Sequence, residues 1–246
     1  MHKPCLLLTA TIHCKDTPFI KRQDPEIRES DYRWAVEGWM GVEGYDTFLF
    51  CENSGADLSR LEKYAASINR FGHNLVFLSL KDNSRSSERG KGYGEMEIIR
   101  HAIERLKDRA SDQMLVKVTG RYRARNAAHF FSQLPSMHGE IICSIGENLT
   151  FTDSRLFAIS LGCARDHLLP RQEEINEFEH KYFEHALSDA VHETILAGGK
   201  WFPLPCDPSL YGFEGTDGTR FGFSPMARVR SKVKRFLARK IYSGIP

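Results

Sequence analysis

A glycine-rich stretch of the chain carries a lysine directly before a helical pattern. In "GKGYGE" (90–95), Lys91 stands among three glycines. Backbone N–H groups at the start of a helix can bind phosphate, and a lysine adds positive charge. We therefore interpret Lys91, Gly92 and Gly94 as an anion-binding loop. The spacing matches neither a Walker A motif nor a dinucleotide fingerprint, so a plain helix entry is the alternative interpretation.

A second basic group surrounds a glycine in "KVTGRYRARN", which begins at Lys117. Lys117 lies between two valines of an apolar strand, where a buried ammonium needs a partner. Gly120 permits close approach of another backbone. Alternate residues of an extended chain share one face, so Arg121, Arg123 and Arg125 would point the same way. Arginine forms bidentate contacts with phosphate, so this row indicates an anion site; a solvated edge strand is the alternative.

Two further stretches place carboxylates beside strands. Asp153 and Arg155 flank Ser154 in "FTDSRLFAIS", where Asp153 could hold a hydroxyl group, a metal or the neighbouring arginine. A local Asp–Arg pair that closes a turn is the alternative there. Glu52 and Asn53, in "ENSG", follow an apolar strand and could contact a ribose or a base. An Asx-type turn would explain the same residues.

The region 173–196 has a helical pattern and contains further titratable side chains. Glu179, His180 or Glu184 could supply a catalytic base. His185, Asp189 and His192 share one helix face, but an apolar stripe on another face leaves them toward solvent. We therefore predict no metal site on this helix.

These stretches must be positioned by a fold of alternating strands and helices. Such alternation predicts an α/β protein with a parallel or mixed sheet covered by helices. Ligands of such folds bind at the carboxyl ends of the strands, where the polar stretches fall. The expected strands are 5–12, 45–55, 74–80, 113–122, 138–146 and 154–162, and the expected helices are 24–40, 57–71, 95–109 and 173–196, with a polar loop at 81–94.

Composition is that of a globular protein without a membrane span. The chain has 246 residues, of which 41% are hydrophobic and 27% charged. Its six cysteines form no C-x-x-C pair, so we expect reduced, mostly buried thiols in a cytoplasmic protein and no zinc site. The apolar run at 5–12 is too short to span a membrane, and no cleavage signal follows it.

The basic charge is concentrated at the end of the chain. Residues 225–246 hold seven of the 34 basic residues and no acidic one, so the rest of the chain has 27 basic against 32 acidic residues. Apolar residues recur there at helical spacing. We expect 1–224 to form one catalytic domain and 225–246 a basic amphipathic helix on anionic membrane. The residues predicted to contact the membrane are Arg228, Lys232, Arg235 and Phe236.

The stretches "ENSG", "GKGYGEMEIIRHAI", "VKVTGRYRARN" and "TDSRLFAIS" together resemble small bacterial glycosyltransferases of surface-polysaccharide (O-antigen, lipopolysaccharide or capsule) gene clusters. The resemblance covers about residues 6–205. It implies a GT-A-like, Rossmann-like fold, a nucleotide-sugar donor and a lipid-linked oligosaccharide acceptor. It also implies a cytoplasmic enzyme that associates peripherally with the inner membrane.

The sequence departs from the common GT-A pattern at the end of the fourth strand. "TGRYRAR" stands where a D-x-D metal motif is expected, so a requirement for Mn²⁺ or Mg²⁺ is open. Basic side chains would then neutralise the departing diphosphate. We predict Glu95 and Asp153 as candidate catalytic bases. The predicted donor contacts are Glu52, Asn53, Lys91, Gly92, Gly94, Lys117, Gly120, Arg121 and Arg123, and the predicted acceptor contacts are Asp153, Ser154 and Arg155.

Two other functions remain open at this point. A sugar nucleotidyltransferase would use the same phosphate contacts but would need a pair of metal-binding carboxylates. A non-enzymatic nucleic-acid-binding protein would join the tail and the arginine row in one patch, with strong salt dependence. The acidic balance of 1–224 argues against nucleic acid as a partner.

Overall fold

The computed structural model describes residues 2–14, 20–81, 84–146, 148–215 and 219–221. Within them, a seven-stranded sheet has the order β3-β2-β1-β4-β7-β6-β8. The first four of these strands run parallel, and β7 runs antiparallel to both of its neighbours. The strands are β1 (Cys5–Ala10), β2 (Thr47–Glu52), β3 (Asn74–Ser79), β4 (Met114–Thr119), β6 (Ile141–Ile142), β7 (Leu156–Ser160) and β8 (Trp201–Phe202).

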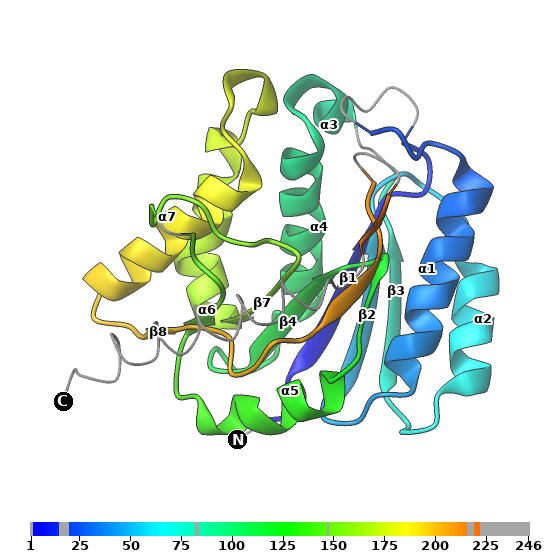
Figure 1. The fold of residues 1–246 in the computed structure, drawn as a ribbon, viewed down its shortest axis with the longest axis horizontal. Coiled ribbons are helices and arrows are strands. Elements are labelled where there is room, and N and C mark those ends of the chain that lie inside the picture. The colour runs from blue at the N-terminus through cyan, green and yellow to red at the C-terminus, as the bar shows by residue number, and fades with distance from the viewer. Residues whose placement is uncertain (1, 15–19, 82–83, 147, 216–218, 222–246) are drawn as a thin grey trace.

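Helices cover both faces of this sheet. In Figure 1, α1 and α2 lie on one side of the strands, and α4 and α7 lie on the other. The helices are α1 (Pro25–Met40), α2 (Ser59–Ile68), α3 (Ser84–Arg89), α4 (Lys91–Arg105), α5 (Ala127–Gln133), α6 (Leu161–Cys163) and α7 (Phe183–Leu196), with short turns η1 (Leu134–Ser136), η2 (Ala164–Leu168), η3 (Leu169–Glu174) and η4 (Glu177–Glu179).

The alternation of side chains along each strand divides the core into two layers. Leu6 and Leu8 of β1 pack with the apolar residues of α1 and α2. Cys5 and Leu7 point to the opposite face and pack with those of α4 and α7. Both faces of the central strands are therefore buried, which explains their continuous apolar runs. The predicted class, an α/β fold with a mixed, mostly parallel sheet flanked by helices, is confirmed.

The path of the chain creates a crevice between β1 and β4. The chain moves outward from β1 through β2 to β3 and then returns to the other side of β1 as β4. In open α/β sheets, ligands bind where the strand order reverses in this way. The antiparallel β7 begins at the edge where β4 ends, so residues before Leu156 also reach this crevice.

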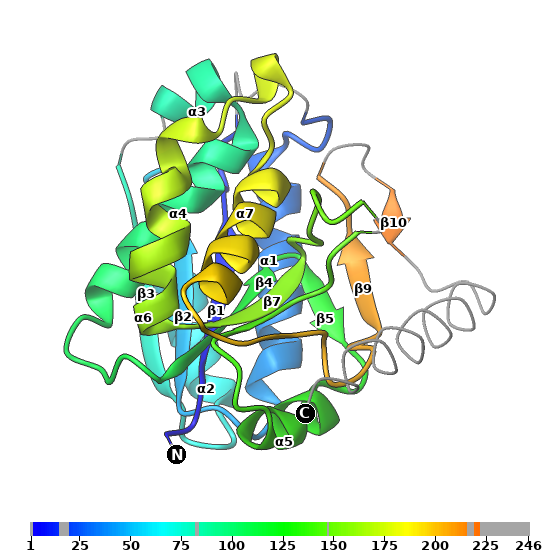
Figure 2. The ribbon, with the colours of Figure 1, turned by 90° about the vertical axis from the view of Figure 1, so that its left-hand side faces the viewer.

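A small second sheet lies beside the crevice. It consists of β5 (Tyr122–Ala124), β9 (Leu210–Phe213) and β10 (Arg220–Phe221), which pair antiparallel. Figure 2 shows it next to α1. The indole of Trp34 meets the rings of Tyr211 and Phe213 edge-on, with centroids 5.4 and 5.7 Å apart. Trp39 Nε1 donates to the carbonyl of Tyr122 at 2.8 Å, which fixes β5 against α1.

Four predicted element boundaries are wrong, each for a local reason. The strand predicted at 113–122 is divided, because Gly120 turns the chain and its amide donates to Thr9 O at 2.9 Å. The strand predicted at 138–146 forms β6 over Ile141–Ile142, and Ile145 makes an isolated antiparallel bridge with Thr152. The helix predicted at 173–196 begins at Phe183, after a left-handed residue at His180 (φ 60°). The polar loop predicted at 81–94 contains α3, and α4 begins at Lys91 rather than at 95.

The predicted amphipathic tail, 225–246, lies outside the described residues, as do its four predicted membrane contacts. Among the residues that are described, no helix is long and apolar enough to cross a membrane.

Candidate functional site

A cavity of about 560 Å³ lies at the carboxyl ends of β1 and β4. Its walls come from both sheets, from α1, α4 and α7, and from the segment between β6 and β7. Four cationic and four anionic side chains line it, so it suits a polar, charged ligand. They are Arg28, Lys91, Arg121, Arg155, Glu95, Asp153, Glu184 and Glu214.

A buried ion pair forms the floor of this cavity. Lys117, in the middle of β4, is completely buried, and its Nζ contacts Oε1 of Glu95 on α4. The same ammonium donates to the carbonyl of Ser154 at 2.6 Å and to Thr119 Oγ1 at 3.1 Å. Oε1 of Glu95 also accepts from Thr9 Oγ1 at 3.1 Å. Within the described part of the chain, Oε2 of Glu95 makes no hydrogen bond or ion pair, so it can accept a proton from a ligand.

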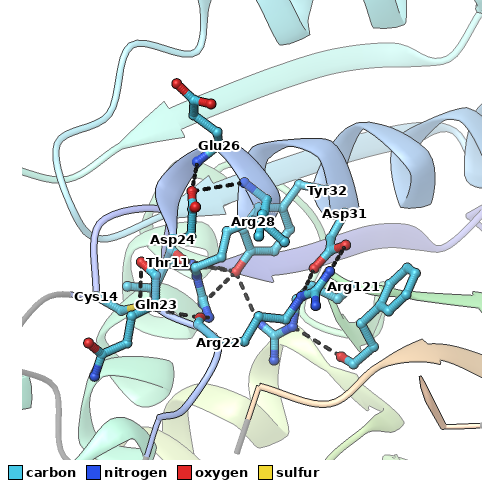
Figure 3. Close-up of polar contacts among 12 residues, drawn as sticks. Thr11, Cys14, Arg22, Gln23, Asp24, Glu26, Arg28, Asp31, Tyr32 and Arg121 are labelled. Atoms are coloured by element: carbon cyan, nitrogen blue, oxygen red, sulfur yellow. Dashed lines mark hydrogen bonds and ion pairs between the residues drawn. The ribbon is translucent and has the colours of Figure 1, made fainter. Parts of the chain in front are cut away.

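A network of hydrogen bonds holds Arg121 in the cavity wall (Figure 3). Arg121 donates from Nη1 to the phenol of Tyr32 at 3.0 Å and from Nε to the carbonyl of Phe213 at 3.1 Å. Arg28 donates to the same phenol at 3.0 Å and to Thr11 O at 2.6 Å. Burial would lower the pKa of Arg121, but the contact with Tyr32, followed by the smaller effects of Tyr122 and Asp31, raises it above its ordinary value. Arg121 is therefore a fixed cation.

Asp153 and Arg155 form a bidentate pair at the start of β7. Arg155 donates from Nε and Nη2 to the two carboxylate oxygens of Asp153, at 2.9 and 2.6 Å. Burial alone would raise the pKa of Asp153, but the hydrogen bonds and charge of Arg155 lower it below its ordinary value. Because both oxygens are engaged and the carboxylate is stabilised, Asp153 is better suited to orienting Arg155 than to taking a proton.

Ser154, between them, connects the cavity to α7. Its hydroxyl donates to Oε1 of Glu184 at 2.7 Å, and Glu184 lines the cavity. The other two candidate bases of the same region, Glu179 and His180, do not line it. The three predicted acceptor contacts, Asp153, Ser154 and Arg155, are thus brought together at one wall.

The glycine-rich stretch has a different role from the one predicted. The amide of Gly92 donates to Oε1 of Glu177 at 3.0 Å, so a carboxylate of the chain already caps α4. A Cβ on Gly90, which has a φ of 100°, would lie 2.6 Å from the Glu177 side chain, and one on Gly94 would lie 2.2 Å from Ser86 Oγ. Gly90 therefore allows close packing of Glu177 and Gly94 allows close packing of Ser86, at the position where an open phosphate loop was predicted. Only Lys91 of the predicted loop residues lines the cavity.

Glu52 and Asn53 are buried and do not line the cavity. Oε2 of Glu52 accepts from the amide and hydroxyl of Ser54 at 2.8 and 2.6 Å, and Oε1 accepts from the amide of Ala56 at 2.9 Å. Asn53 accepts from Thr11 Oγ1 at 2.7 Å. Their positions therefore do not support the predicted direct contact of Glu52 and Asn53 with the sugar donor. Both residues instead stabilise the turn after β2, next to the cavity.

Lys117, Gly120 and Arg123 do not line the cavity, so their positions do not support the direct donor contacts predicted for them. The three ammonium donors of Lys117 are used inside the protein. Gly120 is packed against the Thr9 carbonyl, which a Cβ would meet at 2.5 Å. Arg123 lies over the Trp34 ring at 4.1 Å and pairs with Glu37 at 2.6 Å, on the outside of α1. Of the predicted arginine row, Arg121 lines the cavity, whereas Arg123 and Arg125 lie against Trp34 and Tyr211 outside the cavity lining.

Several lining residues were not singled out from the sequence. Arg28 and Tyr32 have the spacing of ordinary residues of an amphipathic helix. No local sequence signal indicates that the Tyr32 hydroxyl accepts hydrogen bonds from both Arg28 and Arg121. Glu214 follows β9, and its neighbour Gly215 leaves room for the Arg121 guanidinium. Phe151 could have been noticed as an apolar residue in an otherwise polar loop.

The acidic residues nearest the expected metal position do not fit a metal ion. Thr119, Gly120 and Arg121 occupy the place of the D-x-D motif. Glu95 is paired with Lys117 and Asp153 with Arg155, so a divalent cation would meet two fixed positive charges. Across the described ranges, no group of three His, Cys, Asp or Glu side chains is placed to hold a metal.

No protein-family model and no curated protein matches the chain. Among solved structures, it is similar to a protein of Desulfovibrio desulfuricans G20 assigned as a nucleotide-diphospho-sugar transferase (14% identity, TM-score 0.47, covering 83% of this chain and 80% of that one). It is also similar to a cytidylyltransferase from Leptospira borgpetersenii serovar Hardjo-bovis (12%, 0.49, 84% and 77%). A third is the galactosyltransferase LgtC, solved with donor and acceptor sugar analogues (12%, 0.46, 81% and 72%). Identities and TM-scores this low assign no activity to the chain.

Proposed function

We propose that the chain is a GT-A-like glycosyltransferase that moves a sugar from a nucleotide-activated donor to an acceptor hydroxyl. One observation carries the proposal. The carboxylate of Glu95, held through one oxygen by Lys117 and Thr9, lines the same cavity as Lys91, Arg121 and Arg155. Glycosyl transfer with inversion uses both parts: positive charge for a departing diphosphate and a base for the acceptor hydroxyl.

In the proposed reaction, the donor diphosphate lies against Lys91, Arg121 and Arg155. Negative charge grows on the diphosphate as its bond to the anomeric carbon breaks, and fixed guanidinium groups stabilise that charge without reorganising. The acceptor oxygen forms the new bond to the anomeric carbon and loses its proton to Oε2 of Glu95. We favour Glu95 over Asp153 as this base, because Arg155 engages both oxygens of Asp153.

The remaining parts of the proposal rest on the sequence. We propose a lipid-linked glycan of bacterial surface-polysaccharide synthesis as the acceptor, in line with the family resemblance. The basic residues of 225–246 would then hold the protein at the anionic inner face of the membrane. Binding of the full chain to vesicles with and without anionic lipid, compared with a chain ending at residue 224, tests this part separately.

The test combines binding with turnover on the full chain. Nucleoside diphosphates and nucleotide sugars are screened for a rise in melting temperature, with and without Mg²⁺ or Mn²⁺, because a ligand of the native state must raise it. Release of nucleoside diphosphate is then measured for wild type, Glu95→Gln and the surface control Glu104→Gln. We expect Glu95→Gln to lose about a hundredfold or more in kcat while it keeps the thermal shift. Absence of any nucleotide-dependent shift, or full activity of Glu95→Gln, would contradict the proposal.

A sugar nucleotidyltransferase is the alternative, since the same cations suit a nucleoside triphosphate. It would release pyrophosphate from a nucleoside triphosphate and a sugar 1-phosphate. The same preparation is therefore assayed for pyrophosphate, and a positive result there would replace the glycosyltransferase assignment.

A further inference from the structure

The cavity has an aromatic wall that the proposed chemistry leaves unused. Phe151 lines the cavity, and 42% of its side chain is exposed. Exposure of a phenyl ring to water is unfavourable, and it is the kind of apolar surface that ligand sites provide. The ring lies between β6 and β7, whereas Arg121 and Thr11 lie on the β1 and β4 side.

The ring of Phe151 is held in place before any ligand arrives. His185 of α7 meets it edge-on, with ring centroids 5.3 Å apart and an interplanar angle of 82°. Nδ1 of His185 accepts from the amide of Tyr182 at 3.1 Å, which fixes the imidazole. The Phe151 carbonyl accepts from the amide of Gly146 at 2.6 Å. A ring that has an edge-on partner and stands on a hydrogen-bonded backbone loses little conformational entropy when a ligand stacks on it.

Carboxylates accompany this ring on the same wall. Glu184, which adjoins His185 in α7, lines the cavity and accepts from Ser154 Oγ through Oε1. Asp153 lies two residues from Phe151. An apolar ring face bordered by hydrogen-bond acceptors matches a pyranose, whose C–H groups lie on its faces and whose hydroxyls lie on its edge. A nucleobase also stacks on aromatic rings, and the binding experiment below distinguishes a base from a sugar.

We propose that Phe151, supported by His185, is a stacking platform for an uncharged pyranose ring, and that Glu184 accepts hydrogen bonds from the hydroxyls of that sugar. That the sugar belongs to the acceptor rests on the proposed function; the sugar site itself does not. The platform makes the wall between β6 and β7 the part of the cavity that selects the acceptor.

Saturation-transfer NMR of the full chain with methyl pyranosides tests this proposal directly. The panel contains the gluco, galacto, manno, rhamno and N-acetylglucosamine forms, added with and without a nucleoside diphosphate. For any pyranoside that binds, we expect Phe151→Ala to raise Kd about tenfold. Phe151→Trp keeps a ring and should bind as wild type does. Phe178→Ala, which removes an exposed phenyl outside the cavity lining, should also bind unchanged.

The outcomes separate this proposal from the proposed function. Binding of no pyranoside to wild type, or equal binding to Phe151→Ala, overturns the platform whatever the nucleotides do. Loss of nucleoside diphosphate binding in Phe151→Ala with pyranoside binding kept would mean that the ring stacks a base, which also overturns it. Failure of every nucleotide to raise the melting temperature would instead contradict the proposed function, which needs a nucleotide-sugar donor, and would not contradict the platform. If Phe151→Ala does not fold, Phe151→Leu replaces it, because leucine keeps apolar area without a ring.

Discussion

Nζ of Lys117, which is completely buried, is paired with Oε1 of Glu95, a carboxylate that lines the cavity. The two residues come from β4 and α4, so this pair connects the central sheet to the helix that also carries Lys91. The ammonium also donates hydrogen bonds to Ser154 O and Thr119 Oγ1. One side chain therefore positions three segments of the site.

Mutation of Glu95 should lower the free energy of unfolding more than mutation of Lys117. Glu95→Gln leaves a buried ammonium without a counter-charge, and removing one partner of a buried pair costs about 3 kcal/mol. Lys117→Met leaves Glu95 partly in contact with water, so we expect a smaller loss. Urea unfolding of both single variants and the double variant gives the coupling between them. A double variant that is less stable than Glu95→Gln alone would argue against the pair as described.

The Asp153–Arg155 pair should contribute to stability only above acidic pH. The pKa of Asp153 is lowered from 3.8 in the folded protein, so the contribution is complete above that value and is lost as pH falls through the lower folded pKa. Because both side chains are about one-third exposed, we expect Asp153→Asn to cost only about 1 kcal/mol at pH 7. The difference from wild type in urea unfolding should disappear as the pH is lowered. Glu104→Gln, at an exposed pair, serves as the control and should change little at any pH.

Glu177 should show the opposite pH dependence. Burial raises its pKa above 4.5, against the opposing effects of Lys91 and the Gly92 amide. A raised carboxyl pKa means that stability is lost as pH rises through the folded value. Glu177→Gln keeps an acceptor for the Gly92 amide without the buried charge, so its stability relative to wild type should increase from pH 4 to pH 7. Glu177→Ala also lacks the titrating carboxyl, so its difference from wild type should change with pH in the same direction. Because it also loses the acceptor for the Gly92 amide, it should be about 1 kcal/mol less stable than Glu177→Gln at both pH values. A pH-independent difference between Gln and wild type would contradict this account.

Gly120 and Gly41 should respond to alanine with opposite signs. A Cβ on Gly120 would lie 2.5 Å from the Thr9 carbonyl, so Gly120→Ala must move backbone and should cost about 1–3 kcal/mol. At Gly41, with a φ of −89°, the nearest atom would be 3.6 Å away. Gly41→Ala should therefore be neutral or stabilising by up to about 1 kcal/mol. Chemical unfolding of both variants provides the comparison, and equal losses would mean that the close approach at Gly120 is not a constraint.

The sequence predicted the elements of the sheet well because apolar periodicity is a local property. β1, β2 and β3 lie inside the predicted ranges. Of the predicted polar stretches, those after β4 and β6 meet at the cavity, whereas Glu52 and Asn53 after β2 do not line it. Asp24 before α1 is a further local signal: its carboxylate accepts from the amides of Glu26 and Ile27 at 2.9 and 3.3 Å.

The details of the site could not be predicted, because its contacts join residues far apart in the chain. The sequence indicated that Lys117 needs a partner but not that the partner is Glu95. Glycines at the start of α4 suit a bound phosphate and a capping carboxylate equally well, and only the fold brings Glu177 to that position. Helical periodicity predicts Tyr32 as a core residue but does not indicate that its hydroxyl accepts hydrogen bonds from Arg28 and Arg121.

The antiparallel direction of β7 has a consequence for how this protein could diversify. Because β6 ends and β7 begins at the same edge of the sheet, the segment 143–155 starts and finishes at the cavity. Insertions there would add little loop-closure entropy and would leave both strand registers unchanged. Lys91 and Arg121 come from other segments. One wall can therefore be rebuilt for new partners over evolution while Lys91 and Arg121 are inherited unchanged.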